Sequence, residues 1–152
     1  MRPFIRVADA SDLSALTSLV ERYWEFERIK SFDPARITAL LTDLFRSPDR
    51  GQIWVAQSDG RSVGYLLAVY LFSLEHGGLM AEIDEFFVIP EKRSLKIGAA
   101  LLDAATAAMA QRGITHLQLQ LGIHNPHGRR FYEQHGFVAL SEYGLLHKSL
   151  QL

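Results

Sequence analysis

The sequence predicts a mixed α/β (α+β) fold in one domain that spans residues 1–152. A chain of 152 residues, of which 48% are hydrophobic, is long enough to bury one sizeable core. Its hydrophobic periodicity changes in the order β, α, α, β, β, β, α, β, α, β, β, which corresponds to about seven strands and about four helices. No internal repeat and no linker-like segment marks a second domain.

The first third of the chain predicts one strand and two helices. Residues 4–8 (FIRVA) form a short strand-like run, and apolar residues at helical spacing follow over residues 9–29. Ser11 or Asp12 is expected to cap that helix. Asp33 and Pro34 suit the N-cap and the first position of a second helix, which the segment SPDRG closes.

Three strands are predicted to follow as an antiparallel run. The segments QIWVAQ and SVGYLLAVYLFS flank Asp59 and Gly60, a pair that is typical of a tight hairpin turn. The segment AEIDEFFVI forms the third strand, after a second glycine-bearing loop, SLEHGGL.

The last part of the chain predicts two helices and three strands. A helix over residues 97–112 ends near Gly113, and the alternating segment ITHLQLQLGI follows as a half-buried strand. Asn125 and Pro126 open a short helix that ends at Gly136. The segments FVAL and YGLLHKSL are predicted as the two final strands.

Composition and charge exclude several classes of protein. The formal net charge of −1 gives no bulk attraction for nucleic acid or for an anionic membrane. The chain has no cysteine, which rules out disulfides, a thiolate nucleophile and a cysteine zinc site. The N-terminus lacks the apolar core of a signal peptide, and the longest apolar run, VGYLLAVYLF, is too short to span a bilayer as a helix. We therefore expect a cytoplasmic protein with no nucleic-acid and no membrane partner.

The junction in FFVIPEKRSLKIGAALL, residues 86–102, predicts a site for an anion. Pro90 ends a strand, basic side chains follow, and Gly98 lies at the start of the next helix. A helix N-terminus offers unpaired N–H groups and a partial positive charge, and nearby cations add to the attraction. A plain connection with solvated Lys and Arg side chains is the alternative interpretation.

Two motifs resemble the GNAT superfamily of N-acetyltransferases. Arg93, Lys96 and Gly98 in RSLKIG resemble the family's acyl-CoA pyrophosphate loop, with Lys96 at a position where the family has Gly. The segment NPHGRRFYEQHGF resembles the family's later helix, which carries an Asn, a small residue, an aromatic pair ending in Tyr, and then Gly-Phe. The segments YWEFE, FSLEHGG and IDEFFV are also similar to a bacterial GNAT subgroup of unassigned substrate. The predicted order of strands and helices is that of the family as well.

The resemblance implies a GNAT-like, mostly antiparallel central sheet and acetyl transfer from acetyl-CoA to a primary amine of a small molecule, amino acid or peptide. If the position of Lys96 requires a positive φ, a lysine there would lower the stability of the fold by on the order of 1 kcal/mol relative to glycine. If its backbone is helical instead, its side chain could add charge toward a phosphate.

Lys92, Arg129 and Arg130 are candidates for contacts with the CoA 3′-phosphate, and ordinary surface charge is the alternative. The residues implied in cofactor binding are Phe87, Val88, Ile89, Arg93, Ser94, Leu95, Lys96, Ile97, Gly98, Ala99, Asn125, Arg129 and Tyr132.

Amine acetylation needs a proton acceptor, and the acidic residues of AEIDEFF are candidates. A lysine-like amine has a pKa of about 10.4 and is protonated at neutral pH, so a carboxylate must accept its proton directly or through water. Plain strand alternation puts Glu82 and Asp84 on one face, and Ile83 and Glu85 on the other face with the core. Burial would raise the pKa of Glu85. We rank Glu85 first, Glu82 second and Asp84 third, with solvated strand charges as the alternative.

Tyr132 is the residue that the resemblance implies beside the thioester sulfur, where its hydroxyl could protonate the leaving CoA thiolate. A Tyr packed at the edge of the core is the alternative. Glu75, Tyr23 and Glu27 are further candidates for binding the amine substrate.

No metal is expected, because His124 and His127 flank a capping turn and do not share a helical face, and the spacing places no third ligand near them.

An N-acetyltransferase is therefore the leading interpretation of the sequence. One alternative is a non-catalytic acyl-CoA-binding sensor or interaction module on the same fold. Another is a nucleotide-binding domain of a different type, although the glycine spacing fits neither G-x-G-x-x-G nor a P-loop. The final predicted strands could also present an edge for a homodimer.

Overall fold

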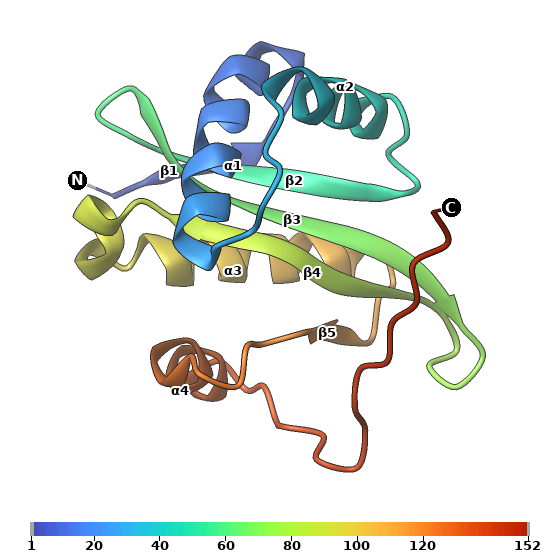
Figure 1. Cartoon of the computed structure of the whole chain (residues 1–152). Coiled ribbons are helices and arrows are strands. Elements are labelled where there is room, and N and C mark those ends of the chain that lie inside the picture. Colours follow the sequence, from blue (N-terminus) through green and yellow to red (C-terminus); the bar gives the residue numbers. More distant parts are fainter. Residues whose placement is uncertain (1, 152) are drawn as a thin grey trace. The chain divides into compact units, whose positions relative to one another are not determined.

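The computed structural model describes residues 2–151, without the side chains of Ser94 and Leu95. Contacts within the chain divide it into two units, Met1–Leu119 and Gln120–Leu152. In the described part of the chain, the first unit holds the sheet and three α-helices, and the second unit holds one α-helix (Figure 1).

The sheet of the first unit has five strands in the order in which they occur along the chain. Neighbouring strands are antiparallel except for the last two, which are parallel. Asp59 and Gly60 have φ values of 52° and 73°, so both central turn residues are left-handed, as a type I′ hairpin turn requires. The strands are β1 (Phe4–Val7), β2 (Gly51–Ser58), β3 (Arg61–Ser73), β4 (Gly78–Val88) and β5 (Leu117–Leu119).

Helices cover both faces of this sheet (Figure 1). On one face, α1 (Leu13–Glu27) and α2 (Pro34–Phe45) bury Leu16, Leu41 and other apolar residues against Tyr65 and Leu67 of β3. On the other face, α3 (Ile97–Gln111) buries its apolar side, and Gly64 of β3 leaves room there for Leu101. The sheet is thus the middle layer of the first unit, and the side chains of β4 alternate between two different cores.

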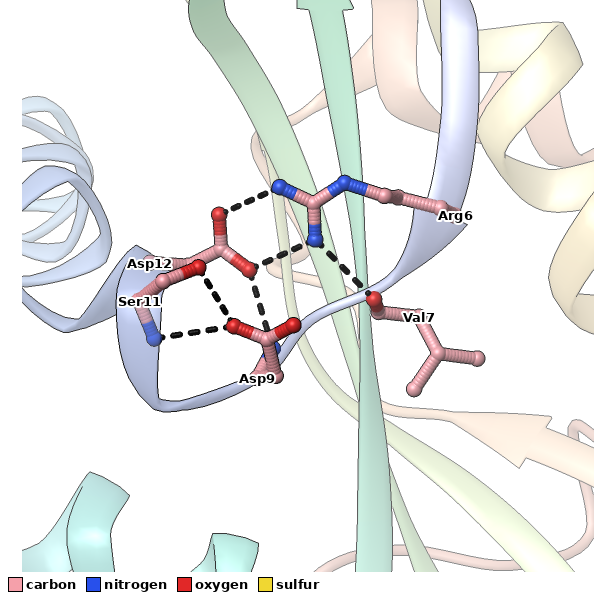
Figure 2. Close-up of polar contacts among 5 residues, drawn as sticks. All are labelled: Arg6, Val7, Asp9, Ser11 and Asp12. Carbon is pink, nitrogen blue, oxygen red and sulfur yellow. Dashed lines mark hydrogen bonds and ion pairs between the residues drawn. The ribbon is translucent and has the colours of Figure 1, made fainter.

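An ion pair holds the junction between β1 and α1 (Figure 2). Arg6 donates two hydrogen bonds of 2.7 Å to the carboxylate of buried Asp12, which also accepts the backbone N–H of Asp9 at 2.9 Å. Asp9 accepts from the backbone N–H of Ser11 and caps the short 3₁₀ turn η1 (Ala10–Asp12). Asp12 therefore occupies the N-cap position of α1 without a side-chain cap bond, because its carboxylate is used by Arg6 and by the Asp9 N–H.

The other predicted helix starts are confirmed. Asp33 caps α2 by accepting the backbone N–H groups of Ala35 and Arg36, with Pro34 as the first helical residue. Asn125 caps α4 (Pro126–Gln134) by accepting the backbone N–H of Gly128 at 2.9 Å.

The expectation of seven strands is wrong for the described residues. Residues 137–140 and 143–150, predicted as the two final strands, have no strand structure, and only Leu117–Leu119 of ITHLQLQLGI is a strand. Hydrophobic alternation shows that a segment could cover a sheet face, but a strand forms only where a neighbouring strand pairs with its backbone groups.

Candidate active site

A β-bulge in β4 determines which of its carboxylates share a face. Leu67 of β3 lies opposite Glu85, and the next residue, Ala68, lies opposite Ile83, so Asp84 is the extra residue. Ile83 and Glu85 consequently point to opposite faces. The sequence-based expectation that they share a face is wrong, since simple alternation holds only for a regular strand.

The same bulge brings Glu82 and Glu85 to one face. Glu82 lies opposite Val69, which packs with the core beneath α1 and α2, and Glu85 lies opposite Leu67 in that same core. Two of the three candidate bases therefore occupy the α1–α2 face together, where plain alternation had separated them.

Glu85 is partly buried and accepts two hydrogen bonds from side chains. The indole N–H of Trp24 donates to Oε2 at 2.8 Å, and the hydroxyl of Tyr65 donates to Oε1 at 2.9 Å. Burial raises the pKa of Glu85, and the nearby Asp84 carboxylate adds to the rise, while the two hydrogen bonds oppose it. A carboxyl group with a raised pKa in a polar setting is suited to general base catalysis.

The other two acidic residues of the strand have different surroundings. Glu82 accepts a hydrogen bond of 3.0 Å from the side-chain amide of Gln118, its neighbour on β5. Asp84 is solvent-accessible at the bulge, and partial desolvation together with Glu82 raises its pKa.

The pairing of β4 with β5 ends before the carboxyl end of β4. The parallel pairing of β4 with β5 covers Ala81, Glu82 and Ile83 and stops at Leu119. On the other side, β4 stays paired with β3 as far as Val88, and the N–H of Ile89 donates to the carbonyl of Val63 at 2.9 Å. Among the described residues, the pairing of β4 with β5 therefore ends at Ile83, and the carbonyl of Val88 accepts a hydrogen bond from the Nε of Arg93 at 2.9 Å.

Arg93, expected at the cofactor pyrophosphate, has its guanidinium against the α1 side of the loop. Its Nε donates to the carbonyl of Val88 at 2.9 Å. The guanidinium lies 4.4 Å from the ring centre of Phe26 and 5.5 Å from that of Phe87. The side chain thus connects the loop after β4 with both α1 and the end of β4.

Two further ion pairs hold the turn η2 (Pro90–Leu95), which follows β4. Glu91 pairs with Arg22 of α1 at 3.1 Å, and Lys92 pairs with Asp59 of the β2–β3 turn at 3.3 Å. Lys92, a candidate for the CoA 3′-phosphate, therefore already has a carboxylate partner. The side chains of Ser94 and Leu95, two further cofactor candidates, lie outside the described part of the structure.

The N-terminus of α3 has no side-chain cap. Lys96 occupies the N-cap position with φ 59° and ψ 21°, so the position where the GNAT motif has Gly is indeed left-handed. The first α-helical hydrogen bond runs from the N–H of Ala100 to the carbonyl of Lys96, at 3.1 Å. The N–H groups of Ile97, Gly98 and Ala99 precede it, in the first turn of the helix, where helices commonly bind anions.

The second unit carries the remaining motif residues. Tyr132 lies on α4 and packs its ring against Phe131 and Phe137, with ring centres 5.3 Å apart in both cases. Asn125 is occupied as the helix cap, and Arg129 lies 3.7 Å from Glu133 one turn further along the helix. Each is thus placed locally by helix geometry.

The candidate substrate residues differ in exposure. Tyr23 packs against the core, with its ring 5.8 Å from Phe87 and 6.4 Å from Tyr65, whereas Glu27 and Glu75 are exposed.

Among the described residues, no group of three or more His, Asp or Glu side chains could hold a metal ion. None of the helices formed by these residues has the length and apolar character needed to cross a membrane.

Sequence reasoning missed the functional relation of Trp24 and Tyr65 to Glu85. Trp24 fits the apolar stripe of an amphipathic helix, and Tyr65 fits a buried strand, so neither pattern indicates a polar partner. The one available signal is the polar atom that each large ring carries, which must find an acceptor when the ring is buried.

Strand β4 thus places the carboxylates of Glu82 and Glu85 on one face of the sheet. The next α-helix along the chain, α3, begins without a side-chain cap and can bind a phosphate at its N-terminus. The family model described as Acetyltransferase (GNAT) family matches residues 13–137. The chain belongs to this family and is an acetyl-CoA-dependent N-acetyltransferase.

Individual relatives agree with this family. The uncharacterized N-acetyltransferase YhfO of Bacillus subtilis (strain 168) is 30% identical over 148 residues, which cover 97% of each chain. The aminoalkylphosphonate N-acetyltransferase of Salmonella typhimurium (strain LT2) is 32% identical over 83 residues, 55% of this chain and 54% of that protein. The crystal structure of a predicted acetyltransferase with acetyl-CoA from Clostridium acetobutylicum has the same fold, with a TM-score of 0.80, 20% identity and 96% of each chain covered.

Proposed function

We propose that the protein acetylates a primary amine of a small molecule, amino acid or peptide, and that the amine attacks the acetyl-CoA thioester directly. The observation that carries this proposal is the bulge in β4, which puts Glu82 and Glu85 on one face directly before the cofactor loop. A base at this point could deprotonate an amine close to an acyl group held along the end of β4.

The chain's groups suit the cofactor at two places. The N–H groups of residues 97–99 have no side-chain cap and can bind phosphate oxygens at the start of α3. The second place is the end of β4 beyond its pairing with β5, where we place the extended amide-containing arm of the cofactor. Acetyl-CoA supplies the activated acetyl group, and we propose Arg129 and Asn125 as further contacts on the basis of the motif they share with the family.

In the proposed reaction, one residue accepts a proton from the amine and another residue donates a proton to the leaving group. Glu85 accepts a proton from the substrate ammonium, directly or through water, so that the nitrogen lone pair can attack the thioester carbonyl. The carbon–sulfur bond then breaks, Tyr132 gives its hydroxyl proton to the leaving thiolate, and the second proton lost by the attacking nitrogen restores the Tyr132 hydroxyl through solvent. Glu82 is the second candidate for the base, and the N–H groups at the end of β4 are candidate donors to the developing oxyanion.

We also propose that the two units act as one catalytic domain in the cytoplasm. The match to the GNAT family over residues 13–137 spans the boundary between Leu119 and Gln120, which supports one functional domain. Cell fractionation with an antibody against the protein tests the location.

Acetyl-CoA binding and amine acetylation test the proposal in sequence. We expect isothermal titration to give micromolar binding of acetyl-CoA, and much weaker binding of adenosine diphosphate, which lacks the pantetheine arm. Thiol release is then followed with a panel of amines. The panel begins with 2-aminoethylphosphonate, because the Salmonella relative is named for aminoalkylphosphonates, and continues with amino acids, polyamines and a peptide. Tight binding of acetyl-CoA without acetylation of any amine in the panel would contradict the proposed acceptor class.

A further inference from the structure

We propose that Trp24 and Tyr65 are positioning residues for Glu85, which together hold its carboxylate in one orientation at the substrate face. The inference rests on the proposed function, in which Glu85 is the base. It adds two residues outside the segments RSLKIG and NPHGRRFYEQHGF, and these residues lie on different elements, α1 and β3.

The hydrogen bonds act on different oxygens of the carboxylate. Trp24 donates to Oε2 at 2.8 Å and Tyr65 donates to Oε1 at 2.9 Å. Rotation of the carboxylate about its last bond would break both contacts at once. A carboxylate can accept about four hydrogen bonds, so each oxygen keeps a lone pair with which to accept a substrate proton.

Both donors are themselves held by packing. The Trp24 ring meets Phe32 edge to face with a centroid distance of 5.8 Å, and Phe32 packs against the core under α1 and α2. Tyr65 is 1% exposed, and its ring contacts Tyr23 edge to face. Donors fixed in this way preorganise an acceptor, because they do not reorient when the acceptor changes charge.

Electrostatics explains why a partly buried base needs such donors. Burial raises the pKa of Glu85, and hydrogen bonds from Trp24 and Tyr65 oppose the rise because they stabilise the ionised form. Among the titratable neighbours of Glu85, Asp84 on β4 raises its pKa further, Tyr65 donates a hydrogen bond to it, and Glu82 lies on the same face of β4. Burial and the Glu85 carboxylate raise the pKa of Tyr65 far above its ordinary value, so its hydroxyl remains a donor at every working pH.

Two single substitutions remove one donor each and keep an aromatic ring. In Trp24→Phe and in Tyr65→Phe, the pKa of Glu85 is expected to rise by about one pH unit, since a hydrogen bond to a charged group contributes about that much. The matched control is Tyr70→Phe, which removes a hydroxyl from the same strand, β3, whose hydrogen-bond partner is Gln52 and not Glu85. The pKa is read from the pH titration of carboxyl carbons in protein labelled with ¹³C-glutamate, and Glu85→Gln assigns the signal.

The same variants are compared in steady-state kinetics with acetyl-CoA and the best amine of the panel. We expect the acid limb of kcat/KM to move up by about one pH unit in both variants. At the wild-type optimum, kcat should fall roughly tenfold or more because the base is less well placed. Tyr70→Phe should keep the wild-type acid limb.

The outcomes separate this inference from the proposed function. If the titration and the acid limb of both donor variants match wild type, the positioning role is wrong, even where Glu85→Gln is inactive. If Glu85→Gln keeps the wild-type rate while the wild type acetylates amines, the assignment of Glu85 as base fails and the inference fails with it. The carboxyl titration needs no acceptor amine, so it decides whether the donors control Glu85 even if no amine of the panel reacts.

Discussion

Trp24 donates its indole N–H to Glu85 across 61 positions of the chain, at a distance of 2.8 Å. This hydrogen bond joins α1 to the strand that carries the candidate bases. It exists only because the bulge at Asp84 turns Glu85 toward the face covered by α1 and α2, and Ile83 toward the opposite face. The bulge thus connects the packing of the fold with the chemistry proposed for the site.

Glu85→Gln tests the base directly. Burial raises the pKa of Glu85, so the acid limb of wild-type kcat/KM should lie above about 4.3, the ordinary pKa of Glu. We expect Glu85→Gln to lose that limb and to lower kcat by roughly 10²- to 10⁴-fold. Glu82→Gln should have a smaller effect and keep the limb. A wild-type pH–rate profile in Glu85→Gln, with loss of the limb in Glu82→Gln, would reverse the two assignments.

Tyr132→Phe tests the proposed proton donor. The ring would keep its packing against Phe131 and Phe137, while the hydroxyl is lost. We expect kcat to fall roughly 10- to 100-fold and the Kd for acetyl-CoA, measured by isothermal titration, to stay within a factor of about two. An unchanged kcat would show that the hydroxyl takes no part in thiolate release.

Lys96→Gly tests the strain at the start of α3. Lys96 has φ 59°, in the left-handed region that costs a side-chain-bearing residue about 1 kcal/mol relative to glycine. We expect this substitution to raise the free energy of unfolding by about 1 kcal/mol in urea denaturation. Lys96→Ala is the matched control, since it removes the charge and keeps Cβ, and it should bring no such gain. Equal gains in both variants would assign the effect to charge instead of backbone strain.

Asp12→Asn tests the ion pair at the β1–α1 junction. The hydrogen-bonded Arg6 guanidinium lowers the pKa of Asp12, so the pair stabilises the fold above the unfolded pKa of about 3.9 and loses that effect as pH falls through the lower folded value. We expect Asp12→Asn to lower the free energy of unfolding at pH 7 by roughly 3 kcal/mol. The penalty should shrink toward pH 2.

A surface pair gives the control for that prediction. Asp49 is fully exposed and lies 3.9 Å from Arg112, so Asp49→Asn should leave the midpoint of urea unfolding unchanged at both pH values. A penalty for Asp12→Asn that is the same at pH 7 and pH 2 would show that the carboxylate charge is not what stabilises the junction.

Local features of the chain could be predicted from the sequence because their physical causes lie within a few residues. Asp33 and Pro34 start a helix wherever they precede an amphipathic run, and Asn125 does the same for α4. Asp59 and Gly60 tolerate the left-handed backbone that a tight hairpin requires. The two GNAT motifs are local in the same sense, and the match over residues 13–137 confirms the family that they indicated.

The features decided by tertiary structure depend on partners far away in the sequence. The face to which Glu85 points is set by one extra residue in the pairing of β4 with β3, and no local pattern of IDEFF reveals it. Trp24 and Tyr65 meet Glu85 because a helix and a strand pack over the same face. Residues 143–150 alternate like a strand but form none, since a strand needs backbone partners that alternation does not provide. The sequence by itself therefore determined the local elements and the family, while long-range strand pairing and packing decided the strand count and the surroundings of Glu85.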